Sequence, residues 1–518
     1  MKYAVSSQEM KLCDRNTSEC FGLDSMVLME RASLAVADDI DSFRKKRGSV
    51  RQYSALVLAG CGNNGGDGVC TARLLKQRGY RVTLSVIGDM TGASDLLLRQ
   101  LDIAKKYGIR VDTFSNIRDN KKGSDFDIIV DALFGIGLSR PLTGVYLDAV
   151  TFINSCKKDR DADLYVVSVD MPSGISADTG EVCGDAVRAD TTVTFNHVKL
   201  GQIMYPGCEY TGHLMVSDVG ITSESFLGKE PETIYYDGDV AALLPKRKRD
   251  SNKGTNGKVL IVAGSRGMSG AAVLAASACL KSGAGMVRVF TAVENAEVVK
   301  ALLPEAILDT YEDFEPVRDK LMTAMEWSTQ AVMGPGIGIE GKGRELVTDV
   351  LERYDKSLVM DADALNIIAD DEKLFKLAGN FATGGKKLIL TPHMGEFARL
   401  VKKPVRECID RRFELAGNLA RKLHCTVICK DARSIVADSN EKKIYINISG
   451  NDGMATAGSG DVLSGITGAL LHAEMSGFDT AVAAAYLHGC AGDVAARTRG
   501  RYSMVASDMV AALSEVLG

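Results

Sequence analysis

The sequence of 518 residues has little proline, no long apolar run and no closely spaced cysteine pair. Its 10 prolines argue against long disordered linkers. Nowhere do about 18 apolar residues follow one another, so we expect no transmembrane helix. The first residues, Met1 to Met10, also lack the apolar core of a signal peptide. We therefore expect a cytoplasmic protein.

The cysteines and the charges argue against further classes of protein. The 12 cysteines are scattered without a C-x-x-C pair, so we expect neither disulfides nor zinc sites and interpret the cysteines as small core residues. The net charge of -5 is modest, and the only dense basic run covers residues 246–249. This run is too short for a nucleic-acid surface and is interpreted as a solvated loop.

The length predicts two large domains. A chain of 518 residues exceeds one ordinary core, and 46% hydrophobic with 25% charged residues is typical of globular proteins. Apolar periodicity is poor over residues 221–250, and Gly228 to Pro231 marks a break. We place the boundary near residue 225, which gives domains over residues 1–225 and 226–518 without an internal repeat.

The first domain is predicted to contain a βαβ unit. Residues 54–59 read as a strand, 60–68 as a glycine-rich turn, 69–78 as a helix and 81–87 as a second strand. The turn, G-C-G-N-N-G-G-D-G, contains the dinucleotide fingerprint G-x-G-x-x-G, and Asp89 follows the second strand about where a ribose-binding acid would lie. Taken alone, this fingerprint predicts a dehydrogenase.

The glycine-rich turn also contains polar residues that a phosphate cradle does not need, namely Asn63, Asn64 and Asp67. Two later apolar runs end in Asp131 and in D-M-P-S-G at 170–174. Because ligands gather at the carboxyl ends of parallel strands, these segments are expected to converge. Oxygen ligands without His or Cys suit a hard cation, although either aspartate alone also fits a turn cap.

Three motifs in order, N-N-G-G-D-G at 63–68, D-A-L-F-G-I-G-L at 131–138 and D-M-P-S-G at 170–174, resemble the NAD(P)H-hydrate epimerases over residues 1–220. The resemblance implies a Rossmann-like three-layer α/β/α domain. It implies K+ bound by Asn64, Asp131 and Ser173, with Asp170 as the acid/base catalyst. The implied substrate is NAD(P)HX, the cofactor hydrated at C6 of its nicotinamide ring. The implied substrate contacts are Asn63, Asn64, Gly65, Gly66, Asp67, Gly135, Ile136, Gly137, Leu138, Ser139, Arg140, Pro141 and Asp170.

The chemistry of such a site needs one carboxyl group. The ring nitrogen expels the C6 hydroxyl, and water returns to either face, which interconverts the R and S hydrates. Asp170 would protonate the leaving oxygen and, once ionised, deprotonate the incoming water. Lys199, in the run 194–201, either neutralises a cofactor phosphate or is a surface lysine with its stem on apolar residues.

The second domain shows a new α/β pattern, with a helix predicted at 270–281. Its apolar runs lie at 258–263, 286–291, 331–333, 358–360, 388–390 and 426–428, and polar or glycine motifs follow them. The stretch 457–465, A-G-S-G-D-V-L-S-G, opens an amphipathic helix whose start favours a bound phosphoryl group. Asp and Ser also cap helix starts for local reasons, so on this stretch alone both interpretations stand.

Six motifs of the second half resemble ADP/ATP-dependent NAD(P)H-hydrate dehydratase over residues 240–518. The resemblance implies a ribokinase-like fold and, with the first half, a bifunctional NAD(P)H-hydrate repair enzyme. Ser434 and Ser459 stand where threonine is frequent in the family, and each keeps the hydroxyl. The motifs are K-G-T-N-G-K-V-L-I-V-A-G-S at 253–265, G-P-G-I-G at 334–338, D-A-D-A-L at 361–365, T-P-H-M-G-E at 391–396, K-D-A-R-S at 430–434 and A-G-S-G-D at 457–461. The implied hydrate contacts are Ala272, Gly336 or Gly338, His393 and Asp461, and the implied nucleotide contacts are Lys430, Asp431, Ala432, Arg433, Ser434 and Gly460.

In this interpretation Asp461 takes the proton of the C6 hydroxyl while the oxygen attacks the terminal phosphoryl group. The N–H groups of 458–460 and Mg2+ would hold the transferred charge. Elimination of phosphate restores NAD(P)H, and the resemblance to bacterial members favours ADP, which becomes AMP, over ATP. Glu396, with Asp361 or Asp363, either orients Mg2+ through water or is a strand-end turn residue. His393 is either a ligand or an ordinary loop histidine.

Two alternatives stay open. A small-molecule kinase of the ribokinase type, acting on a vitamin precursor, would use the same glycine-rich loop and leave a stable phosphorylated product. The first domain would then be a non-catalytic ligand-binding module. We expect small-molecule substrates and a homo-oligomer, and neither nucleic acid nor membrane as a partner.

Overall fold

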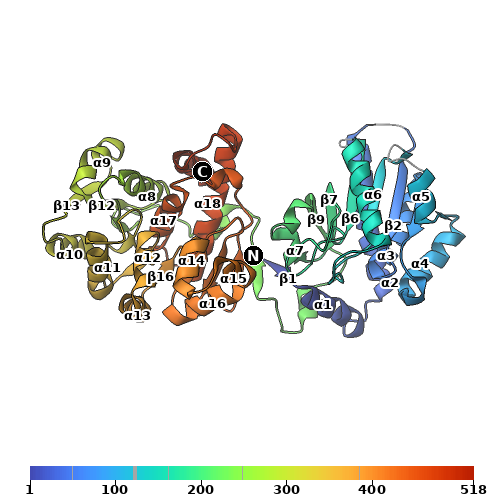
Figure 1. The fold of residues 1–518 in the computed structure, drawn as a ribbon, viewed down its shortest axis with the longest axis horizontal. Helices are drawn as coiled ribbons and strands as arrows, with labels where there is room; N and C mark the ends of the chain where they lie inside the picture. The colour runs from blue at the N-terminus through green and yellow to red at the C-terminus, as the bar shows by residue number, and fades with distance from the viewer. Residues whose placement is uncertain (49–50, 121–124, 161–162, 248, 384) are drawn as a thin grey trace. The chain divides into compact units, whose positions relative to one another are not determined.

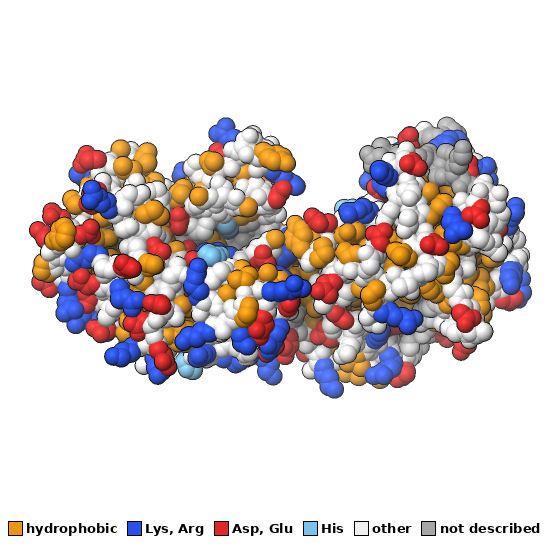
Figure 2. Space-filling view, viewed as in Figure 1, with side chains coloured by type: hydrophobic (Ala, Val, Ile, Leu, Met, Phe, Trp, Pro, Cys, Tyr) orange, Lys and Arg blue, Asp and Glu red, His pale blue; other side chains and the backbone are white. Residues whose placement is uncertain are grey.

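The computed structural model describes residues 1–48, 51–120, 125–160, 163–247, 249–383 and 385–518 (Figure 1). One position of the predicted basic loop, residue 248, therefore lies outside the described residues. The chain divides into two compact units, Lys2–Pro231 and Glu232–Gly518 with Met1. None of the described helices has the length and apolar character to span a membrane. On the face shown in Figure 2, acidic and basic side chains are interspersed.

The first unit is built on a parallel sheet with the strand order β4-β3-β2-β5-β6-β7-β9. Strands β1 and β8 also pair in parallel. The strands are β1 (Lys2–Val5), β2 (Ser54–Ala59), β3 (Arg81–Val86), β4 (Arg110–Val111), β5 (Ile128–Ala132), β6 (Tyr165–Val169), β7 (Thr191–Phe195), β8 (Val198–Lys199) and β9 (His213–Ser217). The helices are α1 (Ser7–Glu19), α2 (Ser25–Lys46), α3 (Asn63–Gln77), α4 (Asp95–Lys106), α5 (Phe114–Asn120), α6 (Val145–Arg160) and α7 (Leu200–Ile203).

Alternate side chains of β2 enter two different cores. Ala55 and Val57 pack in one core with residues of α2, α3 and α4. Leu56 and Leu58 pack in the other with residues of α5 and α6. Because successive side chains of a strand point to opposite faces, helices cover both faces of this sheet. The predicted three-layer α/β/α arrangement is confirmed.

The glycine-rich segment is more helical than the sequence indicated. The turn was predicted to last to residue 68, but α3 begins at Asn63 with Gly62 as its N-cap residue. A Cβ atom at Gly65 would lie 1.8 Å from the Gly60 carbonyl oxygen, and one at Gly68 would lie 2.4 Å from the Cβ of Ala132. These glycines therefore let the first turn of α3 lie directly against the ends of the strands. This close contact explains why the glycine-rich segment is helical.

The second unit contains a mixed sheet in the order β13-β12-β11-β14-β15-β16-β17-β18-β19-β10. Strand β18 runs antiparallel to both neighbours, whereas the pairs from β13 to β17 are parallel. The strands are β10 (Thr233–Tyr235), β11 (Lys258–Val262), β12 (Met286–Ala292), β13 (Ile307–Tyr311), β14 (Gln330–Met333), β15 (Ser357–Met360), β16 (Leu388–Leu390), β17 (Thr426–Cys429), β18 (Ile435–Asp438) and β19 (Ile444–Ile446).

Two groups of helices accompany this sheet. In one, α8 (Ser269–Lys281), α17 (Ser459–Leu470), α18 (Gly477–Arg499) and α19 (Ala506–Val516) pack together. The other consists of α10 (Arg318–Trp327), α11 (Lys342–Arg353), α12 (Asp363–Asp370), α13 (Glu372–Phe381), α14 (Met394–Val401) and α16 (Arg412–Leu423) (Figure 1). Short helices α9 (Ala296–Leu302) and α15 (Val405–Asp410) complete the unit.

Helix α17 lies unusually close to its neighbours. A Cβ atom at Gly465 would lie 2.1 Å from the carbonyl oxygen of Ala275, and one at Gly468 would lie 2.2 Å from a methyl carbon of Val332. Both glycines therefore allow contact between α17, α8 and β14. This packing fixes the start of α17, where the glycine-rich motif at 457–461 lies.

Candidate functional site

A cavity of about 510 Å³ lies in the first unit, at the carboxyl ends of β2, β5 and β6. Helices α1 and α2 also line it, together with residues of α4, α6, β7, β8 and the segment at 219–221. Among the predicted ligand contacts, those that line the cavity are Asn63, Asn64, Asp67, Gly135, Ile136, Gly137 and Asp170. Gly65 and Gly66 are buried beneath it in α3. The predicted contacts outside its lining are Leu138, Ser139, Arg140 and Pro141.

Asp170 occupies a strained turn directly after β6. Its φ of 63° lies in the left-handed region, which costs a non-glycine residue on the order of 1–3 kcal/mol. The backbone is held by two bonds: the Asp170 N–H donates to the Val193 carbonyl at 2.8 Å, and Gln202 Nε2 donates to the Asp170 carbonyl at 2.5 Å. The surrounding structure thus fixes the direction of the Asp170 side chain.

Lys199 is buried, with only 1% of its surface exposed, so the surface-lysine interpretation is wrong. Its Nζ donates to Asp170 Oδ1 at 2.5 Å and to Thr194 Oγ1 at 2.8 Å. A buried ammonium group needs a compensating charge, and Asp170 supplies it. The partner of Lys199 in this structure is therefore Asp170 itself.

Two further carboxylates face this cavity. Burial raises the pKa of Asp67 well above its usual range, and the charges of Asp170 and Asp14 add to the effect. Burial also raises the pKa of Asp14, with a contribution from Asp170 that Lys199 partly offsets. Asp14 lies on α1, outside every motif, so nothing in the sequence pattern marked it as a site residue.

The predicted cation ligands meet at the same end of the sheet. The Asp131 carboxylate is fully buried and accepts hydrogen bonds from Ser173 N–H at 2.9 Å and Ser173 Oγ at 2.5 Å. Burial raises the pKa of Asp131, while the bonds from Ser173 act in the opposite direction. A Cβ atom at Gly135 would lie 3.1 Å from Asn64 Oδ1 and 3.3 Å from Asp170 Oδ2. Asn64 therefore lies beside the Asp170 carboxylate.

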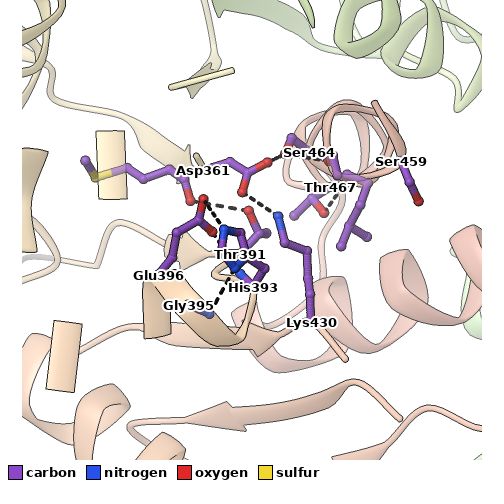
Figure 3. A network of polar contacts seen from close by, with 12 residues as sticks. Asp361, Thr391, His393, Gly395, Glu396, Lys430, Ser459, Ser464 and Thr467 are labelled. Atoms are coloured by element: carbon purple, nitrogen blue, oxygen red, sulfur yellow. Dashed lines mark hydrogen bonds and ion pairs between the residues drawn. The ribbon is translucent and has the colours of Figure 1, made fainter. Parts of the chain in front are cut away.

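The second unit has a buried charged cluster around Asp361, at the end of β15 (Figure 3). Asp361 is 1% exposed and accepts from Lys430 Nζ at 2.7 Å and from Ser464 Oγ at 2.5 Å. Burial lowers the pKa of Lys430, but the charges of Asp361 and Glu396 outweigh this and raise it. The lysine therefore stays charged and joins the ends of β15 and β17 to helix α17.

Asp461 lies in the first turn of α17, and Gly458 is the N-cap residue. Asp461 makes no hydrogen bond within the described chain, so it does not act as the helix cap. Burial raises its pKa to about 7, Asp361 contributes in the same direction, and Lys430 opposes both. A carboxylate that gains and loses its proton near neutrality is suited to general base catalysis.

His393 and Glu396 form the capping box of α14. Gly395 N–H donates to His393 Nδ1 at 2.9 Å, and His393 N–H donates to Glu396 Oε2 at 2.8 Å. Burial raises the pKa of Glu396 to about 7, whereas burial and the nearby Lys430 lower the pKa of His393. His393 therefore has a local structural role and also belongs to the charged cluster.

The other predicted residues surround this cluster. Gly338 N–H donates to Asp363 Oδ2 at 2.9 Å, which joins the 334–338 loop to the D-A-D-A-L motif. Ala272 is buried on α8. Gly460 lies next to the cluster, since a Cβ atom there would be 3.0 Å from Lys430 Nζ. The remaining predicted nucleotide contacts, Asp431, Ala432, Arg433 and Ser434, form the turn between β17 and β18.

His488 on α18 is a site residue that the sequence did not indicate. Its Nε2 lies 3.3 Å from Ser459 Oγ in the glycine-rich motif. Burial lowers the pKa of His488 to about 4, so its ring is neutral and orients the serine without adding charge. A histidine inside a long helix of alanines gives no such signal before the fold is known.

Both halves of the chain match known protein families. Residues 25–201 match the family model described as YjeF-related protein N-terminus, and residues 259–515 match NAD(P)H-hydrate dehydratase. The chain is 36% identical to bifunctional NAD(P)H-hydrate repair enzyme Nnr of Thermofilum pendens, covering 100% of this chain and 96% of the relative. It is 35% identical to Nnr of Moorella thermoacetica, covering 99% and 96%.

One solved structure that the chain matches is ADP/ATP-dependent NAD(P)H-hydrate dehydratase of Bacillus subtilis, co-crystallised with ATP and Mg2+. It is 28% identical with a TM-score of 0.46, and the match covers 54% of this chain and 94% of that one.

Proposed function

Because this chain belongs to the bifunctional NAD(P)H-hydrate repair enzymes, with an epimerase and a dehydratase in one polypeptide, we propose that each unit contains one of the two active sites. The cavity at Asp170 epimerises R- and S-NAD(P)HX. The charged cluster at Asp461 dehydrates the S-hydrate. The observation that carries the second assignment is the half-buried carboxylate of Asp461 at the start of α17, which makes no hydrogen bond among the described residues and has a pKa of about 7.

In the epimerase site, Asp170 transfers protons at the C6 oxygen. As a carboxylic acid it protonates a hydroxyl that leaves from the ring face turned toward it, and as a carboxylate it removes a proton from water that adds to this face. Lys199 balances the negative charge of Asp170 and is held in place by Thr194. The glycine-rich start of α3 offers backbone N–H groups to a phosphate of the cofactor.

The residues at the strand ends fit a K+ ion, which would be held by Asn64, Asp131 and Ser173. The donor set consists of oxygens, and the buried Asn64 Nδ2 has no hydrogen-bond partner among the described residues, so this amide is not committed to another group. When bound, K+ supplies positive charge near the Asp131 and Asp170 turns. The buried Asp131 carboxylate and its bonds to Ser173 support this assignment.

We expect the epimerase rate to depend on K+. Replacing K+ by Li+ in the buffer should lower R/S interconversion at least about tenfold, because a smaller ion does not span the same oxygens. Asn64→Ala should remove this ion dependence. The dehydratase activity of the same samples is the control, and an equal loss of both activities would contradict a K+ site in the first unit.

In the dehydratase site, ionised Asp461 takes the proton of the C6 hydroxyl as its oxygen attacks the terminal phosphoryl group of the nucleotide. Backbone N–H groups of Ser459 and Gly460 at the start of α17 face the transferred charge. The ring nitrogen lone pair then expels phosphate, which leaves with the electrons of the C6–O bond and gives a C6=N cation. Loss of a proton from C5 to the departing phosphate or to water forms the C5=C6 bond of the dihydronicotinamide. Bound Mg2+ supplies charge compensation at the phosphates, with Glu396 and Asp363 able to orient its water ligands.

We propose ADP as the donor, with AMP and phosphate as products. The turn 430–434 and Gly460 hold the nucleotide, and His393, Ala272 and the 334–338 loop hold the hydrate. Lys430 supports this arrangement because it reaches from the nucleotide turn to Asp361.

The test is absorbance at 340 nm with purified S-hydrate and ADP or ATP in parallel samples. We expect a nucleotide-dependent rise, with ADP at least as effective as ATP. The rival vitamin-precursor kinase would instead give a stable phosphorylated product and no rise. Added R-hydrate should also be consumed, because the first unit converts it to the S epimer. Absence of the rise with both nucleotides would refute the proposal.

A further inference from the structure

Helix α1 brings another carboxylate, Asp14, into the cavity that Asp67 and Asp170 also line. Met10, Lys11 and Asp14 of this helix all line the cavity. Residues spaced three and four apart lie on one helix face, so this face of α1 forms a wall. Asp170 reaches the same cavity from the end of β6, so the two carboxylates come from different walls.

The position of α1 is fixed by polar contacts near both of its ends. Ser7 Oγ donates to Asp178 Oδ2 at 2.8 Å at the start of the helix. Asn16 Nδ2 donates to the Ser225 carbonyl at 2.8 Å near its end. The helix is therefore anchored at both ends, and Asp14 lies between the anchors.

The two carboxylates differ in their surroundings. Asp170 is bonded to Lys199 and Thr194, whereas Asp14 makes no hydrogen bond or ion pair within the described chain. The charged groups that line the cavity with Asp14 are Lys11, Asp67, Asp170 and Lys199. The Asp14 side chain is exposed, and partial desolvation by the surrounding residues, then the charge of Asp170, raises its pKa, while Lys199 opposes both. Asp14 thus holds a proton more readily than an ordinary aspartate does.

Inversion at C6 requires water to leave one face of the ring and to add to the other. A carboxyl group on one wall reaches only the face turned toward it. We propose that Asp14 is a second catalytic residue of the epimerase and transfers protons at the ring face opposite Asp170. This inference rests on the proposed function of the cavity and adds a residue to it.

In one direction, the reaction starts with Asp14 protonated and Asp170 ionised. The Asp14 carboxylic acid protonates the C6 hydroxyl, the C6–O bond breaks, and water leaves with the bonding electrons. The ring nitrogen lone pair forms a C=N bond, which gives a cation. A water oxygen on the other face adds to C6, and the Asp170 carboxylate accepts its proton. The proton has moved from Asp14 to Asp170, and the opposite conversion starts from that form.

The experiment follows oxygen exchange and inversion separately. Pure R- or S-hydrate is incubated with the full-length protein in H2¹⁸O without nucleotide, and ¹⁸O content and epimer ratio are measured by chromatography with mass spectrometry. We expect Asp14→Asn to slow inversion by about 100-fold or more, the range of general acid–base effects. It should still exchange the hydroxyl oxygen of one epimer with retained configuration, and Asp170→Asn should do so for the other epimer.

The controls separate this inference from the function on which it rests. Glu19→Gln, on the same helix but outside the cavity lining, should invert at the wild-type rate, and Asp14→Glu should recover part of the lost rate. Inversion by Asp14→Asn at the wild-type rate, or equal loss of inversion and of exchange in both epimers, would overturn the role of Asp14. Failure of the wild-type protein to invert either epimer would instead overturn the epimerase assignment.

Discussion

Asp461→Asn will abolish the nucleotide-dependent rise at 340 nm, with a loss of about 100- to 10,000-fold in dehydration rate. The asparagine keeps the size of the side chain but cannot accept the proton of the C6 hydroxyl. The R/S interconversion of the same variant should be unchanged, because it depends on residues of the other unit. Steady-state kinetics with saturating ADP and S-hydrate measure the loss, and a variant that retains more than about a tenth of the rate would exclude Asp461 as the base.

The pH dependence follows from the pKa of about 7 that burial and Asp361 give to Asp461. A base is active when ionised, so the wild-type kcat/KM should rise about tenfold per pH unit below 7 and level off above it. Asp363 is among the charges that raise this pKa. Asp363→Asn keeps an acceptor for Gly338 and removes the charge, so it should move the rise to lower pH.

The raised pKa of Asp461 also predicts how stable the Asp461→Asn variant is. Its unfolding temperature shows whether a loss of activity comes from misfolding. The folded-state pKa of Asp461 lies above its ordinary value of 3.8, so the folded state binds the proton more tightly than the unfolded state. The resulting stabilisation is present below pH 3.8 and is lost as the pH rises to about 7. At pH 8 the Asp461→Asn variant should therefore unfold at the same or a higher temperature than the wild type.

Much of the architecture could be predicted because buried parallel strands are continuous apolar runs. The predicted strand at 54–59 coincides with β2 (Ser54–Ala59), and the predicted helix at 270–281 is nearly identical to α8 (Ser269–Lys281). The start of α3 was missed because glycine lowers helix propensity in isolation. Here the same glycines allow the close helix–strand contact that stabilises the helix.

The motif residues at strand ends were also predictable, whereas their partners were not. Asp131 lies near the end of β5, Asp170 directly follows β6 and Asp461 lies in the first turn of α17, and these positions mark them in the sequence. Lys199 was ambiguous because burial of its ammonium depends on Asp170, 29 positions away. Asp14 and His488 lie within ordinary helix patterns, and only the packing of α1 and α18 brings them to the two sites.

Replacing Asp170 should also cause a large loss of activity, and it tests whether the first unit is an enzyme or a ligand-binding module. Asp170→Asn should lower R/S interconversion by about 100- to 10,000-fold, since the amide cannot exchange protons with the C6 oxygen. The amide oxygen can still accept from Lys199, so the buried ammonium keeps a partner and the fold should persist. Chromatographic separation of the two epimers over time measures the rate.

The outcome decides whether the first unit is an enzyme or a binding module, because dehydration consumes only the S-hydrate and the R-hydrate must first be converted to it. With R-hydrate as the only substrate, Asp170→Asn should show almost no dehydration, while with S-hydrate it should match the wild type. A binding module would predict equal behaviour of variant and wild type with both epimers. Thr194→Val provides the matched control: it removes a neutral donor to Asp170 and a contact of Lys199 but leaves both charges, so it should reduce the rate far less than Asp170→Asn. If the two variants lost the same amount, the Asp170 carboxylate would be a structural partner of Lys199 and not the proton-transferring group.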